Sequence, residues 1–102
     1  MKTLSVLLFL VGILAAAVHS WNVGSGGLVD WDFNCDFNDP TFRTIATKPS
    51  TGEQCGGVCI ANPSCKYFVY RAGECFMKSG PGGSGGRDFS SVAFCGYVRN
   101  RI

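Results

Sequence analysis

Six cysteines are the residues of this sequence that are best suited to do chemistry. They are Cys35, Cys55, Cys59, Cys65, Cys75 and Cys95. Cysteine thiolates either bind metals or oxidise to disulfides. Structural zinc sites typically contain paired C-x2-C spacings, whereas the first close pair here is Cys55-x3-Cys59. An even number of cysteines in a short exported chain indicates disulfides, so we expect three bonds and no metal site.

A run of alternating acids is the second place where chemistry could occur. Asp30, Asp32 and Asn34 have the spacing with which a calcium-binding loop begins. The glycine and the bidentate glutamate that complete such a loop are replaced by Cys35 and Thr41. We therefore expect no calcium site. The alternation instead predicts a half-buried strand whose acids face water.

Histidine is absent from the part of the chain that we expect to be exported, because His19 is the only one. Without histidine, and with every cysteine paired, the Ser-His, Cys-His and His-metal groups of common hydrolases are missing. The acids lie in polar sequence, without the apolar surroundings that tune a carboxyl pair for acid–base catalysis. We therefore expect no enzyme activity, no catalytic residue and no cofactor.

Residues 1–20 have the pattern of a secretory signal peptide. Lys2 precedes an almost continuously apolar run over 4–18, and small or polar residues follow up to Ser20. The run is shorter than the roughly 20 residues that cross a bilayer, so we expect cleavage before Trp21 rather than a membrane anchor. The sequence therefore predicts a secreted, extracellular protein without stable membrane insertion.

The exported part has 102 − 20 = 82 residues, which is enough for one small domain. Domains of this size bury only about 60% of their unfolded surface, and cross-links often supply the missing stability. Eight basic and seven acidic residues give a net charge of +1, so we expect no nucleic-acid partner, and we expect a monomer. Four of the acids lie within 30–39, and Arg99 and Arg101 close the chain, so a sheet that pairs these ends would bring opposite charges together.

Alternation and turn residues predict about five strands. These are 30–38, 41–47, 65–71, 74–78 and 89–98. The first is expected to place the aromatic rings between Trp31 and Phe37 in the core, together with Cys35. Two glycine-rich segments, 21–28 and 79–87, are expected to be flexible.

A capping-box pattern predicts the start of a helix at Ser50, because a glutamate follows three residues later. Cys55 and Cys59 lie one turn apart on the same side of this helix, so each should bond to a partner elsewhere. The helix should end near Asn62, because a proline follows it. One helix among about five strands indicates an α+β domain with the helix packed on an antiparallel sheet.

The cysteines and their neighbours resemble the PAN/apple domain superfamily. The resemblance rests on a helix with Cys55-Gly-Gly-Val-Cys59, on strands with Cys65-Lys-Tyr-Phe-Val-Tyr70 and Cys75-Phe-Met-Lys78, and on the outer cysteines Cys35 and Cys95. It covers about Trp31 to Val98, within a domain that we place at 29–102.

This resemblance implies a nested disulfide pattern, whereas spacing alone leaves fifteen connectivities open. The implied bonds are Cys35–Cys95, Cys55–Cys75 and Cys59–Cys65. The resemblance also implies a small disulfide-rich fold and a binding module for proteins or carbohydrates. It carries over no ligand and no contact motif.

Four residues are candidates for ligand binding. If Phe68 is a core residue, Tyr67 and Arg71 lie on the opposite face of their strand, with Lys66 and Lys78 as nearby basic groups. Such a tyrosine could stack on a sugar ring or bind an acidic partner. The alternative is a solvated sheet face without a ligand.

The tryptophans and the terminal arginines are weaker candidates. Trp31 is expected in the core, and Trp21 is expected to be disordered or folded onto the domain. Arg99 and Arg101 could contact sulfated glycans, although terminal arginines are usually solvated.

We expect a secreted, non-enzymatic module that binds an extracellular carbohydrate or protein. Two alternatives stay open. One is a secreted toxin or defence peptide, although no strongly cationic or amphipathic segment is present. The other is a structural component of mucus or extracellular matrix, for which the glycine-rich stretches are mild support.

Overall fold

The computed structural model describes residues 21–81 and 86–102. The predicted signal peptide and positions 82–85 of the predicted glycine-rich loop lie outside the described residues. In chain order the elements are β1 (Asn22–Gly24), η1 (Ser25–Gly27), β2 (Val29–Asp36), β3 (Arg43–Pro49), α2 (Gly52–Ala61), β4 (Tyr67–Arg71), β5 (Glu74–Ser79), β6 (Asp88–Val98) and η2 (Arg99–Arg101).

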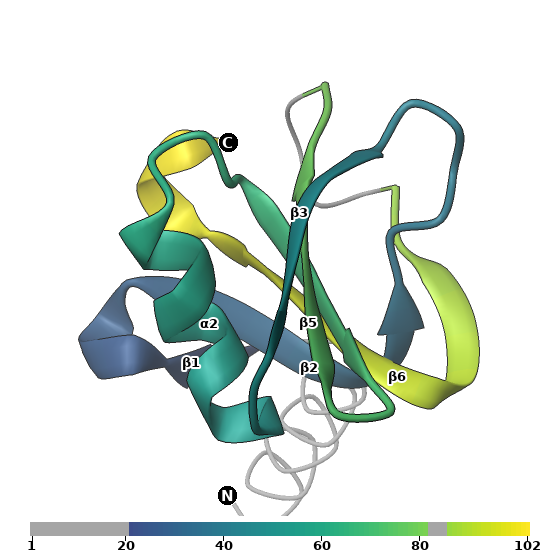
Figure 1. Cartoon of the computed structure of the whole chain (residues 1–102), viewed down its shortest axis with the longest axis horizontal. Coiled ribbons are helices and arrows are strands. Elements are labelled where there is room, and N and C mark those ends of the chain that lie inside the picture. The colour runs from purple at the N-terminus through teal and green to yellow at the C-terminus, as the bar shows by residue number, and fades with distance from the viewer. Residues whose placement is uncertain (1–20, 82–85) are drawn as a thin grey trace, which may run out of the picture.

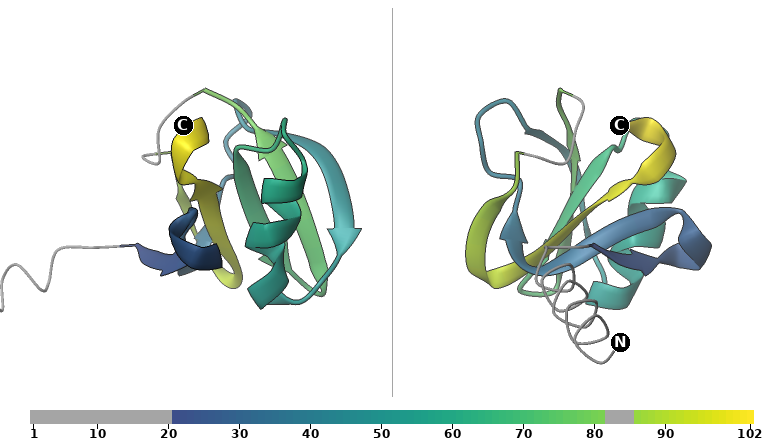
Figure 2. Two further views of the ribbon diagram at one scale, coloured as in Figure 1. Left: turned by 90° about the vertical axis from the view of Figure 1, so that its left-hand side faces the viewer. Right: turned by 180° about the vertical axis from the view of Figure 1, so that it is seen from behind.

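The strands form one antiparallel sheet in the order β1-β2-β6-β4-β5-β3 (Figure 1). Helix α2 packs on one face of this sheet, where it contacts β4, β5 and β6 (Figure 2). The predicted α+β architecture with one α-helix is therefore confirmed for the described residues. The sheet has six strands rather than about five, because β1 was not predicted.

The start of the described chain contains β1 and η1, in a segment over 21–28 for which the sequence predicts flexibility. Asn22 to Gly24 pair with Trp31 to Val29 of β2, so β1 forms one edge of the sheet. Trp21 folds onto the domain, with its ring 5.1 Å from that of Tyr97. Main-chain pairing and this aromatic contact hold a segment whose glycines alone would predict disorder.

Helix α2 begins one residue later than the capping box predicts. Thr51 is the N-cap residue, and its side chain accepts a hydrogen bond of 3.2 Å from the backbone N–H of Gln54. The Ser50 hydroxyl instead donates to the carbonyl oxygen of Thr51. The helix ends at Ala61, close to the predicted end before the proline.

The sheet has a buried cluster on each face. The cluster beneath α2 contains Val29, Cys55, Cys59, Cys65, Phe68, Cys75, Met77 and Val98. The cluster on the opposite face contains Cys35, Phe37, Phe42, Tyr67, Val69, Ala93, Cys95 and Tyr97. The residues between β2 and β3 supply Phe37 and Phe42, so this face is covered without a second helix.

The three disulfides are Cys35–Cys95, Cys55–Cys75 and Cys59–Cys65, the pairs that the family resemblance implies. Two of them fasten α2 to the sheet and to the segment that follows the helix. The third joins β2 to β6 across 60 positions of the sequence.

The alternation of β2 breaks at Asn34, which has a left-handed backbone with φ of 54°. The register with β6 shifts between Phe33 and Cys35 at this point. Phe33 therefore stays on the helix side of the sheet and is 55% exposed, whereas Cys35 joins the opposite cluster. The expectation that Trp31, Phe33, Cys35 and Phe37 share one buried face is wrong, because the bulge after Phe33 turns Cys35 and Phe37 to the opposite face.

The acids of β2 do not simply face water. Asp30 and Arg99 form an ion pair of 2.8 Å, which confirms that the sheet brings the two oppositely charged ends together. Asp32 pairs with Arg87 at 2.8 Å. Asp36 is only 6% exposed. Each of these acids is therefore engaged within the fold.

The last arginine closes the end of α2. The guanidinium of Arg101 donates hydrogen bonds of 2.8 to 3.1 Å to four backbone carbonyl oxygens, those of Cys59, Ile60, Asn62 and Cys65. Carbonyl groups at a helix C-terminus have no partner within the helix, and they favour a positive charge. Arg101 therefore has a structural role, rather than being solvated or free to contact a sulfated glycan.

We predict that Arg101→Leu lowers the free energy of unfolding by about 2 kcal/mol, because charged hydrogen bonds to the helix end are lost. Arg99→Leu is the matched control, since its ion pair is half exposed and should contribute less than about 1 kcal/mol. Urea unfolding followed by circular dichroism measures both. Equal losses in the two variants would contradict the capping role.

We also predict that a disulfide that closes a longer loop contributes more to the free energy of unfolding. One double variant, Cys35→Ala with Cys95→Ala, removes the disulfide that joins residues 60 positions apart. The other, Cys59→Ala with Cys65→Ala, removes the disulfide that joins residues 6 positions apart. The chain-entropy model gives losses of roughly 4 and 2 kcal/mol. Urea unfolding of the two double variants tests this order, and a larger loss for the short loop would contradict it.

Candidate functional site

Tyr67, the central residue of the predicted binding surface, is fully buried. Its ring lies 4.9 Å from the rings of both Phe37 and Phe42, and its hydroxyl donates to the carbonyl oxygen of Pro81 at 2.5 Å. Tyr67 does lie opposite Phe68 on its strand, as expected. That face is covered rather than open, however, so Tyr67 offers no surface on which a sugar ring could stack.

The three basic candidates do not form an open patch either. Lys78 is 8% exposed, and its ammonium donates to the carbonyl oxygen of Phe37 at 2.7 Å. Arg71 is half exposed; it lies 4.8 Å over the Phe76 ring and pairs with Asp36 at 3.4 Å. Lys66 is half buried. Arg71 is thus the most accessible of the four candidate residues.

Burial shifts the pKa values of two of these residues. Burial lowers the pKa of Lys78, and the charge of Asp36, whose carboxylate is 3.9 Å away, partly opposes the shift. Burial raises the pKa of the Tyr67 phenol. Both shifts follow from removing a charge from water inside a covered sheet face, and neither residue faces a ligand site.

We predict that Tyr67 makes the protein less stable at alkaline pH. The folded state keeps a proton that the unfolded chain releases above about pH 10, so this contribution to stability is complete below pH 10 and is lost as the pH rises further. Tyr67→Phe should therefore show a shallower fall in the free energy of unfolding above pH 10. Urea unfolding at several pH values between 7 and 11 measures the slope.

The same variant should lose about 1 kcal/mol at neutral pH, because its hydrogen bond to Pro81 is absent. The lowered pKa of Lys78 makes stability rise with pH up to the ordinary pKa of lysine, but this contribution is common to both proteins. Identical alkaline slopes in the two proteins would contradict the prediction.

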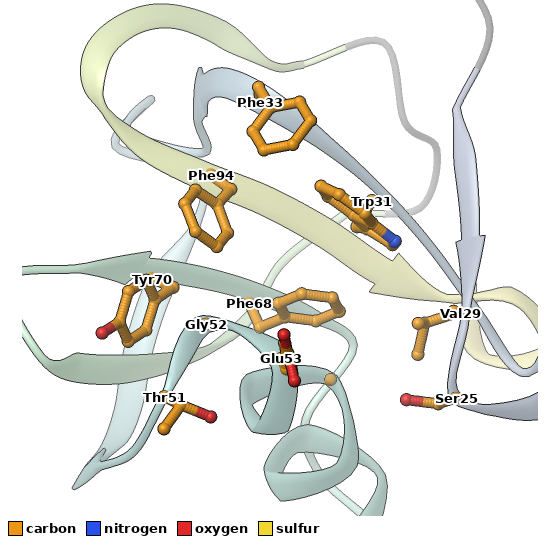
Figure 3. A pocket seen from close by; sticks show the side chains of 12 residues that line it. Ser25, Val29, Trp31, Phe33, Thr51, Gly52, Glu53, Phe68, Tyr70 and Phe94 are labelled. Carbon is orange, nitrogen blue, oxygen red and sulfur yellow. The ribbon is translucent and has the colours of Figure 1, made fainter.

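A pocket of about 780 Å³ lies on the helix side of the sheet (Figure 3). We call it the aromatic pocket, because its lining includes five aromatic side chains. The lining residues are Gly24, Ser25, Val29, Trp31, Phe33, Thr51, Gly52, Glu53, Gly56, Phe68, Tyr70 and Phe94. They come from the β1–η1 end, from β2, β4 and β6, and from the first turns of α2 together with its N-cap.

The pocket exists because one short helix covers a wide sheet. Six strands spaced about 4.8 Å apart span roughly 24 Å, whereas a helix is about 10 Å wide. Helix α2 packs on β4, β5 and β6, whereas η1 contacts β1 and β2. The uncovered surface between them is the aromatic pocket. Phe68 and Val29 are buried at its base, whereas Trp31, Tyr70 and Phe94 are only half buried.

The rings form walls rather than one flat platform. The rings of Trp31 and Phe33 are 4.8 Å apart and meet at 80°, and those of Phe33 and Phe94 are 5.7 Å apart and meet at 71°. Tyr70 continues the row, with its ring 5.1 Å from that of Phe94. Edge-to-face contacts between aromatic rings are favourable, so the Trp31–Phe33 and Phe33–Phe94 contacts support this arrangement.

Few polar groups line the pocket. The Thr51 hydroxyl is already engaged with the backbone of the helix, and Ser25 lies at the opposite side. Glu53 is the only charged residue of the lining. Its carboxylate forms no salt bridge with any residue of 21–81 and 86–102. The pocket can thus offer aromatic faces, one carboxylate and a small number of hydroxyl groups.

Two glycines keep the pocket open. A Cβ atom at Gly52 would lie 2.3 Å from the Phe94 ring, and one at Gly24 would lie 3.0 Å from the Trp31 ring. Separations below 3.0 Å require a neighbour to move, so a side chain at Gly52 would displace Phe94. The backbone can approach these rings closely only because the glycines have no side chain.

Sequence reasoning missed this pocket because it assigned Trp31 and Phe33 to the core. A signal was present: Trp31 and Phe33 alternate on one strand, and Phe68 and Tyr70 alternate on another. With Phe94, these rings exceed what a ten-residue helix can cover. Counting same-face aromatics against the width of the helix would have indicated exposed rings.

Comparisons with protein-family models, with curated proteins and with solved structures found no match for this chain. Within 21–81 and 86–102, no group of three His, Cys, Asp or Glu side chains is placed to hold a metal ion. None of the helices in these ranges is long and apolar enough to cross a membrane. The class of protein therefore has to be inferred from the pocket itself.

Proposed function

We propose that the chain is a secreted, PAN/apple-like binding module that is not an enzyme, and that it recognises an extracellular carbohydrate or protein. The observation that carries this proposal is the aromatic pocket. Ligand sites are typically concave, preformed and apolar, with a few polar groups that orient the ligand. The aromatic pocket is concave and mostly apolar, and Glu53 and the hydroxyl groups of its lining supply a few polar groups.

The disulfides support the extracellular part of the proposal. Small domains with three disulfides are typical of oxidising compartments, where glutathione does not keep thiols reduced. No free cysteine is present among the described residues. The order of the cysteines along the chain and their nested bonds support the likeness to PAN/apple domains.

The composition of the pocket supports binding rather than catalysis. Glu53 is the only carboxylate of its lining, and neither histidine nor lysine accompanies it. General acid–base catalysis needs a positioned proton donor or acceptor with a matched pKa, commonly together with a second group. The pocket is suited to hold a ligand unchanged.

We predict that Gly52→Ala weakens ligand retention about tenfold or more, because its new methyl group displaces the Phe94 ring. Gly57→Ala is the matched control: it adds the same methyl group to the same helix, at a position with nothing within 4 Å. The oxidised wild-type protein and both variants are tested on a glycan array and in a pull-down from extracellular fluid.

Wild-type protein and Gly57→Ala should retain the same ligands, and Gly52→Ala should lose them while it keeps a similar melting temperature. Equal retention by Gly52→Ala would show that the aromatic pocket is not the site. If the wild-type protein retains no glycan and no protein, the binding-module proposal is overturned.

A further inference from the structure

We propose that the aromatic pocket binds an alkylated ammonium group, such as a trimethylammonium, rather than a neutral sugar. This inference rests on the proposed function and names the chemistry of its ligand. Because the proposed function names a carbohydrate or a protein as ligand, we assign the ammonium group to a modified side chain of a partner protein; a free small molecule is the other source, which the experiment separates. Three features of the pocket carry the inference: the arrangement of its rings, its charge and its shortage of hydrogen-bonding groups.

The arrangement of the rings suits a rounded cation. The faces of aromatic rings carry partial negative charge, and several rings around one volume bind quaternary ammonium groups through cation–π attraction. Trp31, Phe33 and Phe94 form a group whose centroids are 4.8 to 6.2 Å apart, and Tyr70 lies 5.1 Å from Phe94, at interplanar angles from 41° to 80°. The rings thus point in different directions and curve around the pocket (Figure 3). A flat sugar ring stacks better on a single open face.

The charge of the pocket favours a cation. Glu53 places one negative charge in the lining, and no lysine or arginine lies there to neutralise it. The exported part of the chain nevertheless has a net charge of +1. None of its basic residues lies in the lining, and three of them pair with acids outside it: Arg71 with Asp36, Arg87 with Asp32, and Arg99 with Asp30. Glu53, which is solvent-exposed, is therefore the charge nearest to a ligand in the pocket, and it is negative.

The shortage of polar partners disfavours a sugar. A monosaccharide carries several hydroxyl groups, and each one that is buried without a hydrogen bond costs free energy. The hydroxyl groups of the lining are those of Ser25, Thr51 and Tyr70, and the Thr51 hydroxyl already accepts a hydrogen bond from the helix backbone. The Trp31 indole adds one N–H donor, which is fewer partners than a monosaccharide has hydroxyl groups to satisfy. A trimethylammonium group has no hydrogen-bond donor, so it leaves nothing unsatisfied against aromatic walls. The volume of about 780 Å³ leaves room for an attached apolar chain.

Choline and 3,3-dimethylbutan-1-ol test this inference, because they share a shape and differ by one charge. Binding is followed by titration with NMR detection of the Trp31 indole N–H, which is assigned with Trp21→Phe. We expect choline to bind at least about fivefold more tightly than the alcohol, at constant ionic strength. Equal affinities would overturn the cation inference. They would leave the proposed function standing, because the glycan array and the pull-down test that function separately.

The carboxylate is tested with a matched pair of variants. Glu53→Gln removes the charge from the pocket, whereas Glu74→Gln removes a charge from the β4–β5 hairpin, outside the lining. We expect Glu53→Gln to weaken choline binding by about three- to tenfold and to leave the alcohol unaffected. Glu74→Gln should change neither affinity. A loss of equal size in both variants would show only a general effect of net charge and would contradict the role of Glu53.

A second titration, with peptides, distinguishes the two possible sources of the ammonium group. A Gly/Ser peptide with one central trimethyl-lysine is compared with the same peptide carrying unmodified lysine, and with choline. Tighter binding of the trimethyl-lysine peptide than of choline assigns the site to a modified protein side chain. Tighter binding of choline assigns it to a free small molecule. If neither trimethylammonium compound shifts the Trp31 signal at millimolar concentration, the inference is wrong.

Discussion

The pairing of β2 with β6 is the constraint on which the rest of this structure depends. The two strands come from near opposite ends of the described chain, and their adjacency places the Cys35–Cys95 disulfide and the Asp30–Arg99 ion pair. It also brings Phe33 opposite Phe94, so that two walls of the aromatic pocket stand side by side. Because β6 continues directly into η2, the same pairing fixes Arg101 at the end of the helix. The strand pairing that closes the domain therefore also forms part of the pocket wall.

A small domain gains little from burying every apolar group, because most of its chain lies near the surface. Here the three disulfides hold α2 and the strands together, so a row of rings can stay half exposed without loss of the fold. The same rings would be an aggregation risk in a domain without such cross-links. The disulfides therefore allow the domain to keep an open pocket without losing its fold.

Much of this architecture could be predicted from the sequence, and the failures have specific physical causes. The helix end before Pro63 and the two strands predicted at 65–71 and 74–78, which leave Ala72-Gly73 as the turn, depend on local chemistry, and each appears close to its expected place. Both turn residues have a positive φ, as a tight hairpin requires. Tyr67 is buried because Phe37 and Phe42 pack against its ring. These two residues lie in the connection between β2 and β3, which is distant in sequence and has no regular pattern. The pocket depends on the width of the helix relative to the sheet, and no single segment encodes that ratio.

Asn34, whose backbone conformation is left-handed, divides β2 into two parts that face opposite sides of the sheet. Before it, Trp31 and Phe33 belong to the pocket; after it, Cys35 belongs to the cross-link on the other face. A regular strand could not divide its side chains in this way, because odd positions would all meet one face. The bulge therefore separates the two halves of the strand. A substitution at Trp31 or Phe33 changes the wall of the pocket without touching the side of the sheet on which Cys35 forms its disulfide.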